Sequence, residues 1–356
     1  MDSAARPEVT AWAGFVEALG AAGDRLARDT AGLDDTERAD AYRALLRALG
    51  NQLGRFEVDR DRPELVPFNG WRQKFLMDNP DFRYWVADVR PGGRYRITGN
   101  RGDAVYMSIT AYRSGGVADA AATTRLDSDA ITFDDDGGFS ITVGGERPAG
   151  GDHLALADGT TTLWLRQFHD DVRTDRLGWC TIEPVEAPAT PAVIDPDRFA
   201  HQVGRLASTM AAVPKIQAAA AKADGAQPNQ LRPWSEMVGG AVFTEPNIHY
   251  LRGGWQLLPG EALVIEGDVV PCRYWNALLY SRFLNSLDHR SRPVSRTGAT
   301  ATIRDGRYRL VLAADDPGPE HGDWLDTEGR PFGIVVLRFL QPAHEPAVPT
   351  ATVVRW

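Results

Sequence analysis

The sequence predicts a mainly β protein built from two tandem, related units, with helical additions at the start of the chain and between the units. Two observations carry this prediction. From residue 84 onward, short runs of alternating apolar and polar residues are separated by Gly, Asp and Pro, which is typical of antiparallel strands joined by turns. In addition, a set of landmark residues occurs twice, which indicates an internal duplication of roughly 90 residues. We therefore expect two antiparallel β-sandwich or jelly-roll-like units.

The duplicated landmarks follow one another at the same spacing in both halves. Pro91-Gly92 corresponds to Pro259-Gly260, and later blocks keep the same order: 136–141 with 305–310, 151–154 with 322–325, and 165–168 with 337–340. Three further pairs fall between these blocks without a gap, namely Gly99 with Gly267, Tyr106 with Tyr274, and Tyr112 with Tyr280. Such agreement predicts that each pair occupies the same place in its unit.

Three segments have helical periodicity. Residues 7–29 place Trp12, Phe15 and Leu26 on one stripe. A second helix is expected after Asp34, because Asp34 and Glu37 have the spacing of a capping box. A third begins at Asp195-Pro196, after a proline-rich linker, and Pro214 is expected to break or kink it.

These elements divide the chain into four parts. Residues 1–58 form an N-terminal helical hairpin, and residues 59–183 form the first β-sandwich unit together with the loop that leads into it. Residues 184–246 hold the Pro-rich linker and its helix, and residues 247–356 form the second β-sandwich unit. A length of 356 residues suits about two domains.

Composition argues against several classes of protein. The chain carries a net charge of −9 and no concentrated basic run, so we expect no nucleic-acid partner. No basic segment precedes an apolar core at the N-terminus, and no apolar run reaches about 18 residues, so neither secretion nor membrane insertion is expected. Cys180 and Cys272 are the only cysteines, which favours free thiols in a reducing cytoplasm. The sequence leaves open whether the protein forms a homo-oligomer.

The second unit resembles a known bacterial family over about residues 247–342. The blocks that carry the resemblance are RYWNALLY at 273–280, SLD at 286–288, DG at 305–306, DDPG at 315–318, GDWLDT at 322–327, Gly333, and RF at 338–339. They identify the domain-of-unknown-function family numbered twelve-fourteen, whose usual Gly-Asn-Trp-Leu occurs here with Asp323 in place of Asn. The resemblance implies a β-sandwich-like fold and no particular reaction. The first half is then a diverged duplicate.

The duplicated strand offers a candidate binding surface. Positions i, i+2 and i+6 of an extended strand share a face, so Tyr274, Asn276 and Tyr280 should lie together. Tyr106, Ser108 and Tyr112 should do the same in the first unit. Hydroxyl and amide groups among aromatic rings are typical of small-molecule pockets. The alternative is that these tyrosines are core residues whose hydroxyls bind the backbone.

Other polar residues near this strand complete the candidate site. We expect His249, Asp288 and Tyr274 to act as catalytic groups by acid–base chemistry. Asp78 and Asp81 flank a proline, and turn formation is an alternative explanation for them. Asp288 has an alternative as well, a salt bridge that fixes a loop. The residues expected to bind a substrate are Tyr250, Trp275, Asn276, Tyr280, Arg282, Asp78 and Asp81.

The motifs favour an enzyme that needs no cofactor. The seven histidines are scattered, and GxSxG, GxGxxG and P-loop motifs are absent, so no metal or nucleotide cofactor is expected. We expect acid–base chemistry (hydrolysis, isomerisation or cyclisation) on a small, largely apolar metabolite in a pocket of the second unit. The alternative is a non-catalytic module that binds a carbohydrate, a hydrophobic ligand or a protein partner.

Overall fold

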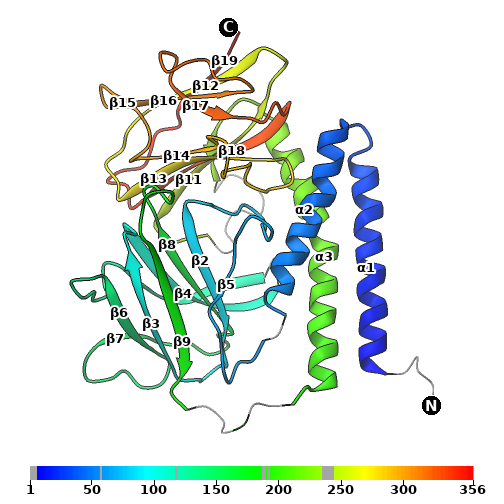
Figure 1. Ribbon diagram of the computed structural model, residues 1–356, viewed down its shortest axis with the longest axis vertical. Helices are drawn as coiled ribbons and strands as arrows, with labels where there is room; N and C mark the ends of the chain where they lie inside the picture. The colour runs from blue at the N-terminus through cyan, green and yellow to red at the C-terminus, as the bar shows by residue number, and fades with distance from the viewer. Residues whose placement is uncertain are drawn as a thin grey trace.

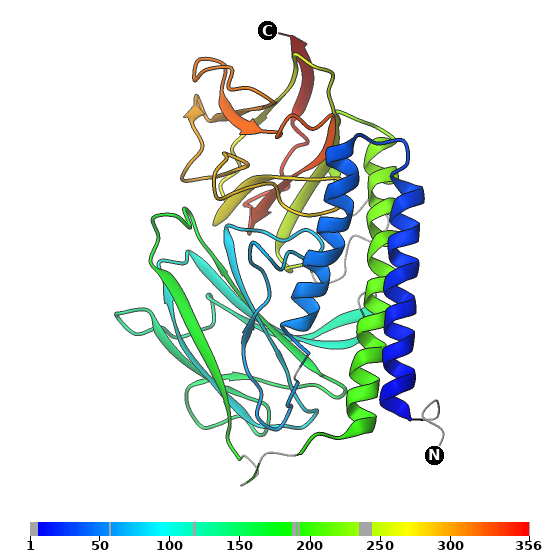
Figure 2. The same cartoon turned by 45° about the vertical axis from the view of Figure 1, so that its right-hand side comes forward.

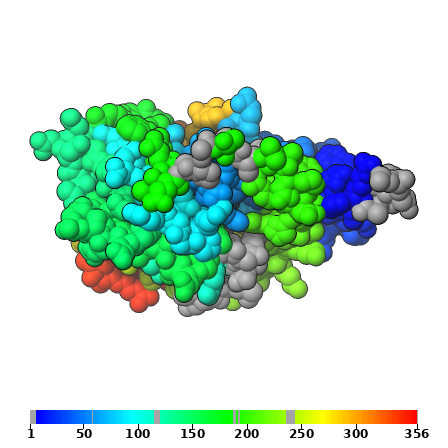
Figure 3. Space-filling view, turned by 90° about the horizontal axis from the view of Figure 1, so that it is seen from below, coloured from blue at the N-terminus to red at the C-terminus, as the bar shows by residue number. Residues whose placement is uncertain are grey.

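The computed structural model describes residues 6–56, 58–116, 119–186, 190, 193–234 and 244–355. Within them, three helices lie side by side along one flank of two stacked β units (Figures 1 and 2). The first unit, in cyan and green, lies below the second, in yellow to red. Seen from below, the first unit and α1 occupy opposite ends of the molecule, with α3 between them (Figure 3).

The helices are α1 (Pro7–Asp29), α2 (Asp35–Leu53) and α3 (Pro196–Gly225). All three begin where the sequence predicted, and an aspartate caps two of them. The Asp34 carboxylate accepts the N–H of Glu37, and the Asp195 carboxylate accepts the N–H groups of Asp197 and Arg198. The helices share a core that includes Phe15, Leu26, Leu45, Met210 and Val213.

Two details of the helices differ from expectation. Pro214 does not interrupt α3, which runs without a break from Pro196 to Gly225. Val213 and Pro214 are both buried, and this packing outweighs the one backbone hydrogen bond that proline cannot make. Trp12 lies off the buried stripe of α1 and is 59% exposed.

The first unit is a sandwich of two sheets. Its inner sheet has the order β1 (Val66–Pro67), β2 (Phe82–Asp88), β8 (Thr162–Phe168), β4 (Tyr106–Gly116) and β5 (Asp119–Asp127). Its outer sheet has the order β7 (Asp152–Leu154), β6 (Gly138–Val143), β3 (Tyr95–Gly102) and β9 (Leu177–Pro184). Apolar side chains such as Ile97, Met107, Ile109, Ile141 and Leu165 fill the space between them.

The second unit repeats this arrangement. Its inner sheet has the order β10 (Arg232–Pro233), β11 (Ile248–Gln256), β18 (Phe332–Leu340), β13 (Tyr274–Tyr280) and β14 (Ser295–Thr297). Its outer sheet has the order β15 (Ile303–Arg304), β16 (Arg307–Ala313), β12 (Glu261–Asp268) and β19 (Thr350–Arg355), and β17 (Asp323–Asp326) pairs with β16. All described strand pairs are antiparallel except β6–β7 and β16–β17. The predicted mainly β fold with helical additions is therefore confirmed.

The two units agree in residue register as well as in strand order. Gly99 lies opposite Phe139, and Gly267 lies opposite Tyr308, as the matched sequence blocks require. In the first unit Asp152 accepts hydrogen bonds from the backbone and hydroxyl of Thr132, and in the second Asp323 accepts the same pair from Thr302. This agreement supports the duplication, which stays an inference from the sequence.

No helix in these described ranges is long and apolar enough to cross a membrane.

Candidate active site between the two β units

The polar strand faces of the two units are buried where the inner sheets meet. On β4, Met107 and Ile109 point into the sandwich core, so Tyr106, Ser108 and Tyr112 point out of it. On β13, Tyr274, Asn276 and Tyr280 share a face in the same way, and all three are at most 3% exposed. A hydrophobic, mainly aromatic cluster joins the two sheets and consists of Phe82, Tyr106, Phe168, Tyr274 and Leu340.

The first unit receives a carboxylate from the segment that leads into the second unit. Glu245 is 3% exposed and accepts hydrogen bonds from Ser108 Oγ at 2.8 Å, Arg166 Nη1 at 3.1 Å and Arg125 Nε at 2.9 Å. Two guanidinium groups therefore hold this acid as a buried ion pair.

The second unit receives a carboxylate in return from the segment that leads into the first. Asp81 directly precedes β2, and its Oδ2 accepts a hydrogen bond from Asn276 Nδ2 at 2.8 Å and another from Ser295 Oγ. Arg338, the strand neighbour of Asn276, adds a favourable charge but no direct ion pair within the described residues. We call Asp81, Asn79, Tyr274, Asn276, Ser295 and Arg338 the Asp81 cluster.

The two exchanged acids occupy matched positions. Arg166 lies opposite Ser108 in the first unit, and Arg338 lies opposite Asn276 in the second. Each arginine donates a hydrogen bond from Nη2 to a strand tyrosine, to Tyr112 at 3.3 Å and to Tyr280 at 2.7 Å. Register also matches Arg125 with Ser295. Arg125 lies on β5 opposite the residue two positions after Ser108, and Ser295 lies on β14 opposite the residue two positions after Asn276. The second unit thus has a hydroxyl where the first has a guanidinium.

The Asp81 cluster contains buried polar atoms without partners. Asn79 Nδ2, Tyr274 Oη, Asn276 Oδ1 and Arg338 Nη1 have no hydrogen-bond partner among the described residues, although all four side chains are at most 5% exposed. Buried polar groups are nearly always hydrogen-bonded. These four atoms surround one carboxyl group and offer hydrogen-bond donors and an acceptor to a small polar ligand.

Burial also sets the protonation of this cluster. It raises the pKa of Asp81, and the hydrogen bonds from Ser295 and Asn276 offset only part of the effect. Burial raises the pKa of Tyr274 well above its ordinary value, so this phenol stays protonated. The cluster therefore combines a carboxyl group that can take up or release a proton with a neutral donor and a guanidinium group.

A second polar cluster lies beside the first. Asp78 accepts hydrogen bonds from the backbone N–H of Ser286 at 2.9 Å and from its hydroxyl at 2.7 Å, and Lys74 Nζ donates to that hydroxyl at 2.8 Å. Lys74 is fully buried, and burial lowers its pKa to about 8. Asp78 is thus a structural anchor between two loops that are 208 residues apart.

The backbone of these two loops is strained. Met77 (φ 67°) and Leu284 (φ 59°) adopt the left-handed conformation that side chains of this size rarely enter, and Leu76 is at φ 30°. A hydrogen bond from Met77 N to the Leu284 carbonyl, 2.7 Å long, joins the strained positions. Strain of this kind is retained where it fixes a functional arrangement.

Four residues named from the sequence lie outside the layer between the sheets. His249 is on the opposite face of β11 from Tyr250, and its Nε2 lies 3.9 Å from Glu345 Oε1. Trp275 packs in the core against Tyr308. Arg282 bonds Glu37 of α2 at 2.7 Å, and Asp288 bonds Arg290 at 3.2 Å.

The remaining named residues come together where the inner sheets of the two units meet, namely Tyr250, Tyr274, Asn276, Tyr280 and Asp81, with Asp78 next to them. Tyr250 Oη accepts the backbone N–H of Glu245 at 3.3 Å. The sequence reasoning did not assign Arg338, Asn79 or Ser295 to the site. Arg338 had a usable signal, because arginine recurs at the matched position, Arg166, inside an otherwise apolar strand.

Comparisons with known proteins agree with this architecture. A family model described as a protein of unknown function (DUF1214) matches residues 261–344. The crystal structure of an uncharacterized protein from Burkholderia cenocepacia is 30% identical, with a TM-score of 0.90 over 97% of this chain and 96% of that one. The VPA0106 protein from Vibrio parahaemolyticus shares the fold at 12% identity, with a TM-score of 0.50 over 88% of this chain and 97% of that one. No curated protein matches this chain.

Proposed function

Because residues 261–344 of this chain match the DUF1214 family of proteins of unknown function, we propose the activity of the chain from its own residues: it is an enzyme that uses acid–base chemistry at the Asp81 cluster. Its substrate is a small, largely apolar metabolite that carries a polar oxygen group. The observation that carries the proposal is a set of four buried atoms, around a carboxyl group of raised pKa, that have no hydrogen-bond partner among the described residues.

Four members of the cluster have distinct roles in this proposal. Asp81 transfers the proton, since its raised pKa brings protonation closer to neutral pH. Arg338 Nη1 and Tyr274 Oη donate hydrogen bonds to the substrate oxygen on which negative charge develops. Asn276 fixes the Asp81 carboxyl group through Nδ2 and leaves Oδ1 to accept a hydrogen bond from the substrate.

The surroundings favour a largely apolar substrate. The rings of Phe82 and Phe168 lie 5.5 Å and 5.8 Å from that of Tyr274, so the hydrophobic part of a bound molecule would meet aromatic surface. Asp81 is only 8% exposed and Asn276 is fully buried. Binding therefore includes an opening between the two units, which then close around the substrate and exclude water. Hydrolysis, isomerisation and cyclisation all fit these groups.

Conversion of compounds in a bacterial metabolite extract tests this proposal. Wild-type protein, Asp81→Asn and Asp288→Asn are each incubated with the extract, and mass spectrometry follows which compounds disappear and which appear. Asp288 is a suitable control because its carboxylate bonds Arg290 outside the Asp81 cluster. We expect the same compound to be converted by wild type and by Asp288→Asn but not by Asp81→Asn. Equal conversion by all three proteins would contradict the proposal.

The second candidate function is a non-catalytic module that holds a hydrophobic ligand. The aromatic cluster between the sheets favours it, because Phe82, Tyr106 and Phe168 supply apolar contact without any titratable carboxyl or imidazole group. This function predicts that a compound is retained by the protein and recovered unchanged. Asp81→Asn would then bind as much of that compound as wild type does.

We also propose that the protein works in the cytoplasm. Cys180 and Cys272 are free thiols, and this state supports a reducing compartment. Fractionation of cells that express the full chain tests the location, and recovery in the periplasmic or extracellular fraction would contradict it.

A further inference from the structure

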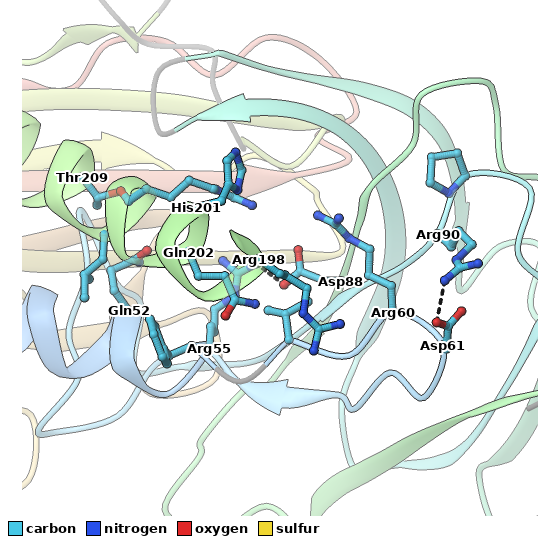
Figure 4. A pocket seen from close by; sticks show the side chains of 15 residues that line it. Gln52, Arg55, Arg60, Asp61, Asp88, Arg90, Arg198, His201, Gln202 and Thr209 are labelled. Carbon is cyan, nitrogen blue, oxygen red and sulfur yellow. Dashed lines mark hydrogen bonds and ion pairs between the residues drawn. The ribbon is translucent and has the colours of Figure 1, made fainter. Parts of the chain in front are cut away.

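A separate cleft lies where the C-terminal end of α2 and the N-terminal half of α3 face the first β unit (Figure 4). Its volume is about 340 Å³. Five arginines line it, from three parts of the chain that are distant in sequence, namely Arg55, Arg60, Arg90, Arg198 and Arg205. Asp61 and Asp88 are the carboxylates among the described lining residues, and with His201 counted as neutral these described residues carry a net charge of +3.

Both carboxylates are already bound. Arg55 pairs with Asp88 at 3.2 Å, and Arg90 pairs with Asp61 at 2.5 Å (Figure 4). That leaves Arg60, Arg198 and Arg205, none of which has an ion-pair partner in the described part of the chain.

Arg60 gives the strongest indication of a ligand. Its Nε is buried and has no hydrogen-bond partner among the described residues. A guanidinium group has five N–H donors and no acceptor, so it needs oxygen atoms from elsewhere when protein oxygen atoms are not in reach. Gln52 and Gln202 add amide groups to the lining, and Phe56, Pro91 and Leu206 add apolar surface.

We propose that this cleft binds a small phosphorylated molecule. One guanidinium group can bind two phosphate oxygens at once. Three guanidinium groups without carboxylate partners therefore require more acceptor atoms than one carboxylate offers. The excess positive charge suits an anion of two or three negative charges, and the volume is in the range of small-molecule sites. The apolar lining leaves room for the organic part of the ligand.

This cleft is distinct from the Asp81 cluster. Asp81 immediately precedes β2 and Asp88 ends it, so the two places are separated by the length of that strand, roughly 20 Å. Evidence for or against the phosphate site is therefore independent of the proposed acid–base activity.

Calorimetric titration with inorganic pyrophosphate at constant ionic strength tests the proposal on the full chain. We expect saturable binding that weakens at least about tenfold in the double variant Arg198→Ala, Arg205→Ala, and also in Arg60→Ala. Arg28→Ala is the matched control, since Arg28 is an exposed arginine on α1 outside the cleft, and it should bind as wild type does. Far-ultraviolet circular dichroism verifies that each variant is folded.

Three results would overturn the phosphate assignment. The first is the absence of saturable pyrophosphate binding to the wild-type protein. The second is an equal loss in Arg28→Ala, which would mean that total charge and not the cleft attracts the anion. The third is binding of citrate as tight as that of pyrophosphate, which would assign the cleft to carboxylates.

Discussion

Asp81 and Glu245 show how neighbouring residues divide the roles of two matched acids. Glu245 lies between Arg125 and Arg166 and pairs with both guanidinium groups. Asp81 meets Asn276 and a serine at the corresponding places, so its charge is less well compensated and burial raises its pKa. The first acid therefore stabilises the structure, and the second can exchange a proton.

Substitution of the two acids should separate these roles. Between pH 3.8 and the raised pKa, the folded protein binds more protons at Asp81 than the unfolded chain does. Wild type should therefore lose stability relative to Asp81→Asn as the pH rises through this window. We expect Asp81→Asn to be at least as stable as wild type at pH 7. Glu245→Gln should cost about 3 kcal/mol because it leaves Arg166 buried without its counter-charge. Urea denaturation of both variants measures this, and equal losses would contradict the division.

Lys74 should make stability depend on alkaline pH. Its pKa is about 8 in the folded protein, against an ordinary 10.5, so between these values the unfolded chain binds more protons. The free energy of unfolding therefore rises with pH across this window. Relative to Lys74→Met, which does not titrate, wild type should gain about 3 kcal/mol from pH 8 to pH 10.5. A difference that stays constant in urea denaturation over this range would refute the explanation.

Glycines on the outer sheets are required by close contacts between strands. A Cβ on Gly99 would meet the Trp179 carbonyl and lie 2.7 Å from Phe139 Cζ, and a Cβ on Gly267 would meet the Tyr308 ring. In both units the glycine lies beside an aromatic residue on the neighbouring strand. The landmark pairs found in the sequence thus correspond to one packing arrangement made twice.

Alanine at these glycines should destabilise the protein. We expect Gly99→Ala and Gly267→Ala each to cost about 1–3 kcal/mol, with the larger cost at Gly99, where the obstacle is backbone. Gly14→Ala is the control, because a Cβ there meets nothing within 4 Å. Alanine is more favourable than glycine in the interior of α1 by about 0.5–1 kcal/mol, so this variant should be at least as stable as wild type. Thermal denaturation distinguishes these outcomes. An unchanged midpoint for Gly99→Ala would contradict the packing described.

At the scale of the whole molecule, the helices hold the two β units in one arrangement. Glu37 of α2 is 1% exposed and pairs with Arg282 at 2.7 Å and Arg330 at 2.6 Å, both in the second unit. The first unit meets α2 at the other end, where Arg55 pairs with Asp88. Helix α2 and Arg55, two residues beyond its C-terminal end, therefore connect to both units through ion pairs.

Removal of the buried helix contact should destabilise the whole molecule. Glu37→Gln leaves two guanidinium groups without their shared carboxylate, and we expect a loss of about 3–5 kcal/mol in the free energy of unfolding. The matched control is Asp35→Asn in the same helix turn, whose pair with Arg38 is exposed and should change stability by less than about 1 kcal/mol. Similar losses for both variants would show that Glu37 has no special connecting role.

The sequence predicted local structure better than contacts between distant segments. Strand alternation and the repeated spacing identified which residues share a face, and capping residues located two helix starts. Which loops meet was not readable, because Asp81 and Ser295 are 214 residues apart and no local pattern connects them. Closeness in sequence is equally uninformative here, because Arg282 and Asp288 follow Asn276 closely along the chain but do not lie with it between the inner sheets.

The most direct test of the central claim, that Asp81 works on a substrate between the two β units, is a crystal structure of the protein with the compound that it converts. We predict that an oxygen atom of this compound lies within hydrogen-bond distance of the Asp81 carboxyl group and Arg338 Nη1, with its apolar part against Phe82 and Phe168. A compound bound only elsewhere, beside His249 on the opposite face of β11 or in the arginine-lined cleft, would contradict the claim.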